Sequence, residues 1–531
     1  MKHFYLIAVV AALLAACTPK SNNQTGTGSL TTKAITGPVT WDSPDLAWKQ
    51  DTSPVRYSLF LDIAWAPMDV WGSDQVSQKV TELTGVSFDV TKRQNANHLS
   101  TVMASGSYPD SIFVFSNKHL YEDPAISQPW NRLIPQYAPE WMQLIDPSYI
   151  VAATKDDGNF YTMYTHFRDD AYWKDMSLPV SYGEPTIMFR DDIMAAIGNP
   201  RMESFDDFYN ALKMVKEKYP DYTPYLEPSL NQVALLTWTG LMFQYSDFQV
   251  DQNGKLSMPI RQKAQMKDYF AFKNKLVREG LMSVEGLTYN FEQQKQAILA
   301  GKVFSTAAQI YDVDVFNADL NAMGSKSYYT ALSKPLTYNG AIRYAPVYAN
   351  PGFAGFYITT ATKNPGRLIR LMEFMFSPQG DRLTQWGVEG LGYTLNANGL
   401  PIINQNIEWK VRGDNVWYFG ATFLTEVQKA LVPQNPQFSQ VTKLMYDFKP
   451  YWKSDILLSK VIPLQETNEY EVKTSVATIY SNNVNLIISA RTDAQFEQAF
   501  NSFYSQLEAL PLDAYTAFAQ ARYDAAKAAA R

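Results

Sequence analysis

Residues 56–64 (RYSLFLDIA) and residues 110–115 (DSIFVF) enclose the part of the chain that decides the fold. Between them, a helical pattern at 75–83 precedes a second strand pattern at 86–90 (VSFDV) and a short helical pattern at 99–104. The last stretch is almost continuously apolar, as in a parallel strand that is buried on both faces. Strands that alternate with helices in this way predict an α/β layer fold.

The same alternation resumes further along the chain. Strands are predicted at 156–163 (after a turn), 186–190, 302–306 and within 351–360. Helices are predicted at 191–197, from Ser204 to before Pro220, at 291–301, from Pro365, and from Ser377 to near Gly387. Ser204 and the acids after it fit a capping box. After residue 420 the chain reads as mostly helical, with an alanine-rich helix at its end.

Composition excludes several classes of protein. The 531 residues are 46% apolar and 18% charged, which is typical of a globular chain that forms two large units or three to four smaller ones. With 46 basic and 52 acidic residues the net charge is −6, so no nucleic-acid partner is expected. A single cysteine permits neither an intrachain disulfide nor a cysteine-cluster zinc site.

That cysteine, Cys17, follows a basic start and the apolar stretch 4–16, which is shorter than a membrane-spanning helix needs. The segment LAAC (14–17) resembles the bacterial lipobox, in which the cysteine is lipidated and becomes the new N-terminus. We therefore expect residues 1–16 to be a signal peptide. Residues 17–52 would be the palmitate-carrying cysteine and a flexible spacer. This predicts an extracytoplasmic protein that is lipid-anchored to the cell membrane.

Motifs for catalysis are weak. The sequence contains no H-E-x-x-H, no G-x-S-x-G and no phosphate-binding G-x-x-x-x-G-K-[ST] pattern. Acidic doublets occur at 156–157, 169–170, 191–192 and 206–207. A glycosidase needs two carboxylates at a fixed distance in space, which a sequence does not define. We predict a protein that is not an enzyme; a surface-anchored polysaccharide-degrading enzyme and a structural or adhesive lipoprotein are the alternatives.

Several segments, taken together and in this order, carry a resemblance to a known family. They are LSTVMASGSYPDSIFVFSN (99–117), DDGNFYTM (156–163), PTIMFRDDIMAAIGNPRMESFDDFYNALKMVKEKYPD (185–221), FEQQKQAILAGKVFSTAAQIYD (291–312) and NPGFAGFYITTATKNPGRLIRLMEFMFSPQGDRLTQWGVEG (350–390). With the lipobox, they resemble the bacterial extracellular solute-binding lipoproteins of ABC importers, in the group of maltose- and oligosaccharide-binding proteins.

The resemblance implies a two-lobed, periplasmic-binding-protein-like α/β fold of type II, with a ligand cleft between the lobes. Lobe 1 would hold 53–165 and 345–395, and lobe 2 would hold 185–330 and 405–531. The chain would cross near 163–185, 330–345 and 395–405. A monomer that closes on its ligand and delivers it to membrane permease subunits is implied.

The expected ligand is a carbohydrate, because aromatic faces suit the C–H faces of sugars and planar polar groups suit their hydroxyls. A peptide-binding member of the same fold is the alternative. The expected contacts are loop residues at the cleft ends of predicted strands: Trp65, Ser116, Asn117, Tyr164, Tyr182, Glu184, Trp238, Gln309, Tyr311, Phe353, Trp386, Glu389 and Tyr393. No cofactor and no metal are expected, because residues 219–224 lack the alternating oxygen ligands of the calcium loop of some relatives.

Overall fold

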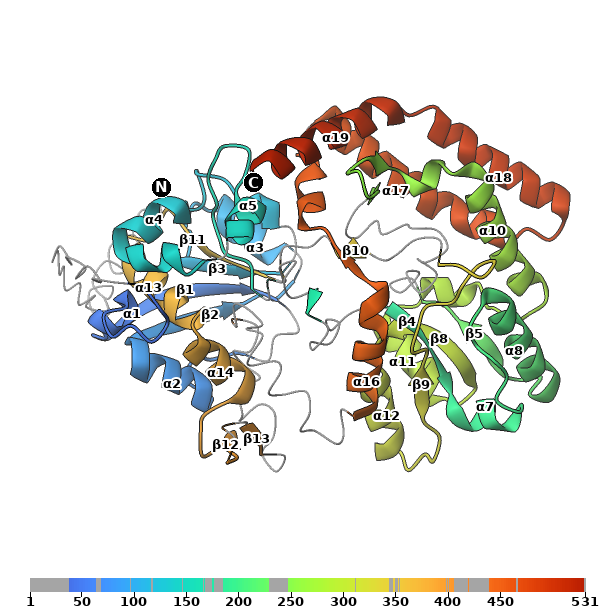
Figure 1. The fold of residues 1–531 in the computed structure, drawn as a ribbon, viewed down its shortest axis with the longest axis horizontal. Coiled ribbons are helices and arrows are strands. Elements are labelled where there is room, and N and C mark those ends of the chain that lie inside the picture. Colours follow the sequence, from blue (N-terminus) through green and yellow to red (C-terminus); the bar gives the residue numbers. More distant parts are fainter. Residues whose placement is uncertain are drawn as a thin grey trace, which may run out of the picture.

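The computed structural model describes residues 38–63, 68–95, 97–115, 118–145, 147–165, 174–175, 185–228, 247–310, 312–342, 347–348, 354–397, 401–404, 439–464 and 467–529, with single positions 167, 352, 399 and 419. Two separate four-stranded sheets lie at the centres of two lobes (Figure 1). We call the lobe around the first sheet lobe 1 and the other lobe 2.

The sheet of lobe 1 has the order β11-β3-β1-β2. Its strands are β1 (Val55–Asp62), β2 (Val86–Lys92), β3 (Ser111–Val114) and β11 (Gly355–Ile358). β1 pairs in parallel with β2 and with β3, whereas β11 pairs antiparallel to β3. The α/β prediction is thus confirmed for this lobe, and all four residues of β3 are buried, as its continuous apolar character predicts.

Helices cover this sheet on both sides. They are α2 (Gln75–Thr84), α3 (His98–Ala104), α4 (Trp130–Tyr137), α5 (Pro147–Ala153), α13 (Pro365–Met375) and α14 (Pro378–Trp386), with 3-10 turns η1 (Lys118–Tyr121) and η2 (Pro139–Gln143). Every residue of α13 is buried, because the helix lies under other helices as well as on the sheet. Gly85 ends α2 at φ +72°, and a Cβ there would lie 2.2 Å from the Thr52 carbonyl oxygen, so only glycine fits.

The first described segment docks on lobe 1. Its short helix α1 (Ala47–Gln50) presents two backbone N–H groups to two buried glutamate side chains. The amide of Ala47 donates to Glu140 Oε1 (2.5 Å), and that of Trp48 donates to Glu373 Oε2 (2.9 Å). Arg367 also donates to the Ser53 carbonyl (2.8 Å). Residues 38–53, which we call the N-terminal strap, are therefore attached to lobe 1.

The sheet of lobe 2 has the order β5-β8-β4-β9. Its strands are β4 (Pro185–Arg190), β5 (Thr223–Leu226), β8 (Val303–Gln309) and β9 (Tyr329–Ala331). Around it lie α7 (Asp191–Ala196), α8 (Phe205–Lys218), α10 (Lys263–Arg278), α11 (Phe291–Leu299) and α12 (Asp312–Ala322), with η4 (Pro259–Arg261), η5 (Glu285–Thr288) and the small ladder of β6 (Gln249–Val250) and β7 (Leu256–Ser257). The predicted capping box at Ser204 is present, with Asp207 as its partner.

The C-terminal part extends lobe 2. It comprises α16 (Ser439–Phe448), η10 (Lys449–Tyr451), β14 (Lys453–Ser454), η11 (Ile456–Val461), α17 (Asn468–Ile488), α18 (Asp493–Glu508) and α19 (Leu512–Ala529). α17 packs on α10 and α18 through the rings of Phe270, Tyr480 and Phe503. Figure 1 shows α19 reaching back from lobe 2 to α5 of lobe 1. No helix among the described residues is long and apolar enough to cross a membrane.

The two lobes meet around a short parallel pair of β10 (Val347–Tyr348) and β14. β10 lies between the lobes in Figure 1. Next to this pair, η11 belongs to both hydrophobic cores: Ile456 packs in the core of lobe 1, while Leu458 and Val461 pack in that of lobe 2. Among the described residues, the junction therefore includes a packed region that both cores share.

Two predictions about lobe 1 are wrong. Residues 395–405 do not cross to lobe 2, because β12 (Tyr393–Leu395) and β13 (Pro401–Ile403) form a hairpin and Phe419 still stacks on Phe113 in the core of lobe 1, with ring centroids 4.5 Å apart. This passage therefore lies between Phe419 and α16. The strand predicted at 156–163 is not formed either, because its backbone bonds to the Asn131 side chain and the Trp130 amide instead of to a ladder. Only an isolated bridge, between Tyr164 and Gly355, follows it.

Candidate functional site

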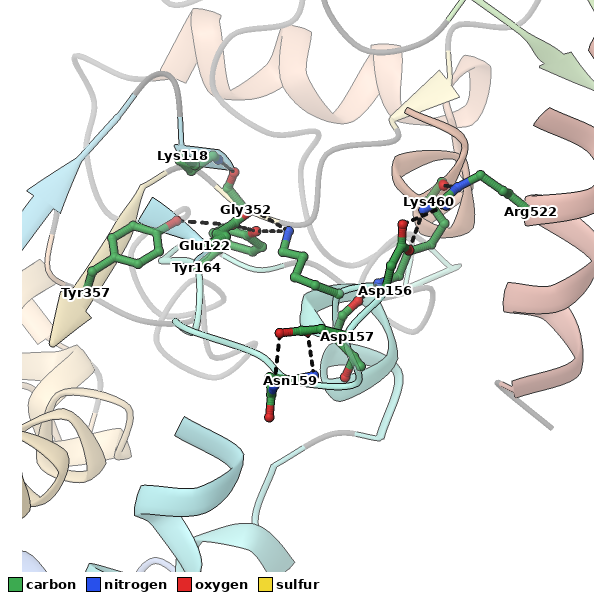
Figure 2. A network of polar contacts seen from close by, with 12 residues as sticks. Lys118, Glu122, Asp156, Asp157, Asn159, Tyr164, Gly352, Tyr357, Lys460 and Arg522 are labelled. Atoms are coloured by element: carbon green, nitrogen blue, oxygen red, sulfur yellow. Dashed lines mark hydrogen bonds and ion pairs between the residues drawn. The ribbon is translucent and has the colours of Figure 1, made fainter. Parts of the chain in front are cut away.

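A buried polar cluster lies in lobe 1 where the lobes meet (Figure 2). We call its five members, Lys118, Glu122, Lys155, Tyr164 and Tyr357, the junction network. Lys118 lies in η1 and Glu122 directly after it, and Lys155 lies in the turn after α5. Tyr164 stands at the start of the first passage between the lobes, and Tyr357 lies in β11. The network therefore collects segments that are far apart in sequence at the place where the lobes are joined.

Glu122 is the centre of this network. Its side chain is 7% exposed and accepts an ion pair from Lys155 Nζ at 2.7 Å. The hydroxyls of Tyr164 and Tyr357 also donate to it, the latter at 3.1 Å. Burial alone would raise the pKa of Glu122, but Lys155 and the two hydroxyls outweigh it and hold the pKa below its ordinary value. Glu122 is therefore an anion that stabilises its neighbours.

Tyr164 lies between two cations. Lys118 Nζ and Lys155 Nζ lie 4.7 and 5.5 Å from its ring centroid, which favours cation–π attraction. Its residue is 3% exposed, and its hydroxyl already bonds to Glu122 and accepts from Lys155 at 2.8 Å. A Cβ on Gly352 would lie 2.5 Å from Tyr164 Cβ, so Gly352 lies directly against this residue. In this structure Tyr164 is a buried member of the network and not an open platform for a ligand.

Lys118 connects the network to the second passage. Its Nζ donates to the carbonyl of Gly352 at 3.1 Å. Burial, together with the charge of Lys155, lowers the pKa of Lys118 to about 8 although Glu122 opposes the shift. Within the junction network as described, two lysines therefore lie beside the Glu122 carboxylate.

A second group of contacts joins the lobes directly (Figure 2). Arg522 of α19 donates from Nη1 to Asp156 Oδ2 (2.9 Å) and from Nη2 to Asp156 Oδ1 (2.7 Å), a bidentate ion pair. Lys460 of η11 donates to the Thr154 carbonyl. We call these four residues the interlobe clasp. The Arg522 hydrogen bonds hold the pKa of Asp156 below its ordinary value, so the pair is ionised at neutral pH.

In lobe 2, polar groups gather where β8 ends and α12 begins. The backbone amide of Gln309 donates to Asp312 Oδ2 at 2.9 Å. Within the described part of the chain, Gln309 Oε1 and Asp312 Oδ1 are buried and have no hydrogen-bond donor. Burial raises the pKa of Asp312 to about 7 and that of Asp314 to about 6. This strand end faces the junction side of the sheet, because β4, which is antiparallel to β8, begins there as the chain enters lobe 2.

The corresponding strand end of lobe 1 is also polar. Asp62 is the last residue of β1, and Arg93 follows β2, with 3.5 Å between Arg93 Nη1 and Asp62 Oδ1. Burial raises the pKa of Asp62, although Arg93 opposes the shift. In open α/β sheets ligands bind beyond the carboxyl ends of strands, so both lobes present hydrogen-bonding groups at the expected edge.

The structure separates the predicted contact residues. Trp386 and Tyr393 pack together, with ring centroids 5.3 Å apart, at the end of α14. Tyr393 and Glu389 line a pocket of about 940 Å³ among the N-terminal strap, α2 and α14, in a different part of lobe 1 from Tyr164. Trp386 itself is 4% exposed. The other predicted contacts, like Cys17, lie outside the described residues: Trp65, Ser116, Asn117, Tyr182, Glu184, Trp238, Tyr311 and Phe353.

The described acidic doublets have structural partners. Asp192 pairs with Arg190 at 2.6 Å, Asp207 completes the capping box of α8, and Asp157 accepts from the backbone and side chain of Asn159. Asp156 belongs to the clasp. Residues 169–170 lie outside the described ranges. In the described part of the chain no three metal-ligating side chains come together.

Solved structures similar to this one share its two-lobed arrangement. The alginate-binding protein AlgQ2, solved without calcium ion, has a TM-score of 0.67 and 21% identity over 90% of this chain and 99% of its own. FusA of S. pneumoniae, an ABC-transporter substrate binding protein in complex with kestose, has a TM-score of 0.65 and 16% identity over 89% of this chain and 100% of its own. No protein-family model and no curated protein sequence matches the chain.

A third similar structure is an ABC-transporter-associated, HMO-binding solute-binding protein from Bifidobacterium longum infantis. Its TM-score is 0.66, with 14% identity over 89% of this chain and 99% of its own. These likenesses span about nine tenths of this chain and nearly the whole of the others. The chain therefore has the two-lobed α/β fold of the ABC-transporter solute-binding proteins, as its sequence predicts.

Proposed function

We propose that this protein is the substrate-binding lipoprotein of an ABC import system, and that it captures an oligosaccharide between its lobes. The observation that supports this most strongly is the junction. Two sheets with polar strand ends face a region where the lobes are joined by a packed pair of short strands and by the junction network. A ligand that contacts both lobes binds the closed form more tightly and shifts the population towards it.

The binding free energy that such a site must supply is modest. A micromolar affinity corresponds to about −8 kcal/mol, and each aromatic–sugar stack contributes on the order of 1 kcal/mol. Hydrogen bonds to charged groups supply about 1.5–3 kcal/mol each, so two or three stacks and a few such bonds suffice. Gln309 and Asp312 offer acceptors in lobe 2. The predicted contacts outside the described residues remain the proposed source of the stacking rings.

A thermal-shift screen tests this proposal. Alginate oligosaccharides, kestose, milk oligosaccharides and N-glycan fragments are the probes, because the similar proteins bind ligands of these kinds. A ligand at one hundred times its Kd stabilises the protein by about 2.7 kcal/mol. We expect at least one of these classes to raise the Tm. A rise with a dipeptide and tripeptide mixture, and with no sugar, would favour the peptide-binding alternative.

The same samples separate binding from hydrolysis. A binding protein returns the oligosaccharide intact after prolonged incubation, whereas a glycosidase shortens it. Chromatography of the recovered sugar, with and without protein, distinguishes the two. We propose the first outcome, because the described acidic doublets are engaged in an ion pair, a helix cap and a turn.

The membrane tether is a separate proposal and has its own test. Residues 1–37 lie outside the described residues, and the N-terminal strap begins at residue 38. We propose that Cys17 is lipidated and that permease subunits receive the ligand from the closed form. Radiolabelled palmitate should be incorporated by the natural chain and not by Cys17→Ser. Equal labelling of both would refute the anchoring proposal and leave the binding proposal intact.

A further inference from the structure

The interlobe clasp differs from the other ion pairs around it because it joins parts that must move relative to each other. Asp156 and Thr154 belong to the turn after α5 of lobe 1, and Lys460 and Arg522 belong to η11 and α19. The backbone of this turn is fixed by bonds between Lys155 and Asn159 (2.7 Å) and between Gly158 and Lys155 (3.0 Å).

On the other side, α19 and η11 form one unit. Arg522 Nε donates to the Lys460 carbonyl at 2.6 Å, and the Tyr523 hydroxyl donates to Asp455 Oδ2 at 2.7 Å. The clasp therefore joins two pieces that are each internally fixed. Any rotation between the lobes must be taken up by the bonds from Arg522 and Lys460 to lobe 1.

The position of the clasp decides the direction of its effect. In Figure 1, α19 and α5 lie on one side of β10, while α12 and the β12–β13 hairpin mark the opposite ends of the two lobes. The β10–β14 pair and Ile456 at the start of η11, which packs in the core of lobe 1, are the natural pivot, whereas Leu458 and Val461 further along η11 already pack in the core of lobe 2. When the ends that carry α12 and the hairpin approach each other, the parts beyond the pivot separate, and the clasp must stretch.

We propose that the interlobe clasp stabilises the open form of the protein and so sets how much ligand-binding energy is needed for closure. This regulation rests on the proposed function, since it concerns the same binding site. The clasp is a bidentate pair with side chains 26% and 46% exposed, for Arg522 and Asp156 respectively. Bidentate geometry strengthens such a pair, whereas water and the neighbouring Lys155 and Lys460 weaken it. The pair is therefore strong enough to bias the equilibrium between the open and closed forms, and weak enough for ligand binding to break it.

The test measures the population of the two forms without any ligand. Spin labels are attached at Met323→Cys, which lies just after α12 and is 65% exposed, and at Leu395→Cys in β12, which is 46% exposed. The full chain carries Cys17→Ser, so that only the introduced cysteines react. Arg522→Gln and Asp156→Asn each remove the ion pair. We expect either variant to raise the closed-to-open ratio by about threefold to tenfold, seen as more short distances in pulsed EPR.

Arg278→Gln is the matched control. Arg278 is 30% exposed, pairs with Asp493 at 2.6 Å and donates from Nε to the Ala490 carbonyl at 3.0 Å, so it copies the contacts of Arg522 inside lobe 2 alone. It should leave the distances unchanged. Salt screens the Arg522–Asp156 pair, so raising the salt concentration from about 0.05 to 0.5 M should shift the natural chain towards the closed form. Arg522→Gln lacks this pair and should not shift.

Unchanged distances in both clasp variants, or a shift to longer distances, would overturn the proposal. A ligand adds a second readout: an oligosaccharide found by thermal shift should bind Arg522→Gln about threefold to tenfold more tightly than the natural chain. If no oligosaccharide binds, the proposed function fails while the ligand-free distances still decide the role of the clasp. If a sugar binds both chains equally, the clasp proposal fails and the function stands.

Discussion

Replacing Glu122 with glutamine should destabilise lobe 1 through the junction network. The change keeps the shape of the side chain but removes the negative charge that pairs with Lys155 and accepts from two tyrosine hydroxyls. Removing one partner of a buried pair costs about 3–5 kcal/mol. Lys155 is 30% exposed and can turn towards water, so we reduce the expected loss to about 2–3 kcal/mol.

Urea denaturation followed by tryptophan fluorescence measures this loss, because Trp48, Trp71, Trp130 and Trp141 are buried in the core of lobe 1. At about 2–4 °C per kcal/mol for a unit of this size, the Tm of lobe 1 should fall by roughly 5–10 °C. The control is Glu82→Gln, whose carboxylate is 66% exposed and pairs with Lys79 at 2.6 Å. It should cost less than about 0.5 kcal/mol.

The pH dependence gives an independent check. The pKa of Glu122 is lower in the folded chain than in the unfolded one, so its stabilisation is present above the unfolded pKa and is lost as the pH falls through the folded pKa. The natural chain and Glu122→Gln should therefore become more alike in acid. Equal denaturation midpoints for Glu122→Gln and Glu82→Gln at pH 7 would refute this account of the network.

Three further predictions concern lobe 1 and the C-terminal helices. Burial, with the charge of Glu140, raises the pKa of Glu373 from 4.5 to about 8, so its stabilising contribution is full below pH 4.5 and is lost as the pH rises to about 8. Glu373→Gln should remove this fall between pH 4.5 and pH 8 in urea titrations. Gly85→Ala should lower the Tm of lobe 1 by several degrees in calorimetry, because the added Cβ meets a backbone carbonyl at positive φ. Asn274 donates to three carbonyls at the end of α17, so Asn274→Ala should cost about 1–3 kcal/mol in urea denaturation, and no loss would contradict this capping role.

The fold was largely predictable because its central strands are encoded locally. The stretch at 110–115 is almost continuously apolar, and all four residues of β3 are buried, as expected of a strand covered on both faces. The stretch at 56–64 carries the apolar run Leu59–Leu61, which is buried in β1. The hairpin at 393–403 and the packing of Phe419 were missed for the opposite reason. A single ring inserted into a distant core leaves no periodic pattern, so the third passage was placed too early.

The candidate site was harder to predict. Charged residues are expected at the surface, so nothing in the sequence marks Glu122 and Lys155 as a buried pair. The sequence marks Tyr164 only as an aromatic at the start of a crossing, and the structure shows that two lysines and Glu122 surround it. Partners for such groups come from helices and strands far away in sequence, which only the folded chain brings together.

The docking of residues 38–53 on lobe 1 has a mechanical consequence. If the protein is anchored through Cys17 as proposed, the anchor acts on lobe 1 alone, since Glu140, Glu373 and Arg367, which hold the N-terminal strap, all belong to that lobe. Tension along the anchor would turn the body as a whole and would not pry the two halves apart. On that proposal lobe 2 would carry none of the load, and ligand binding between the lobes would not depend on the orientation of the protein at the membrane.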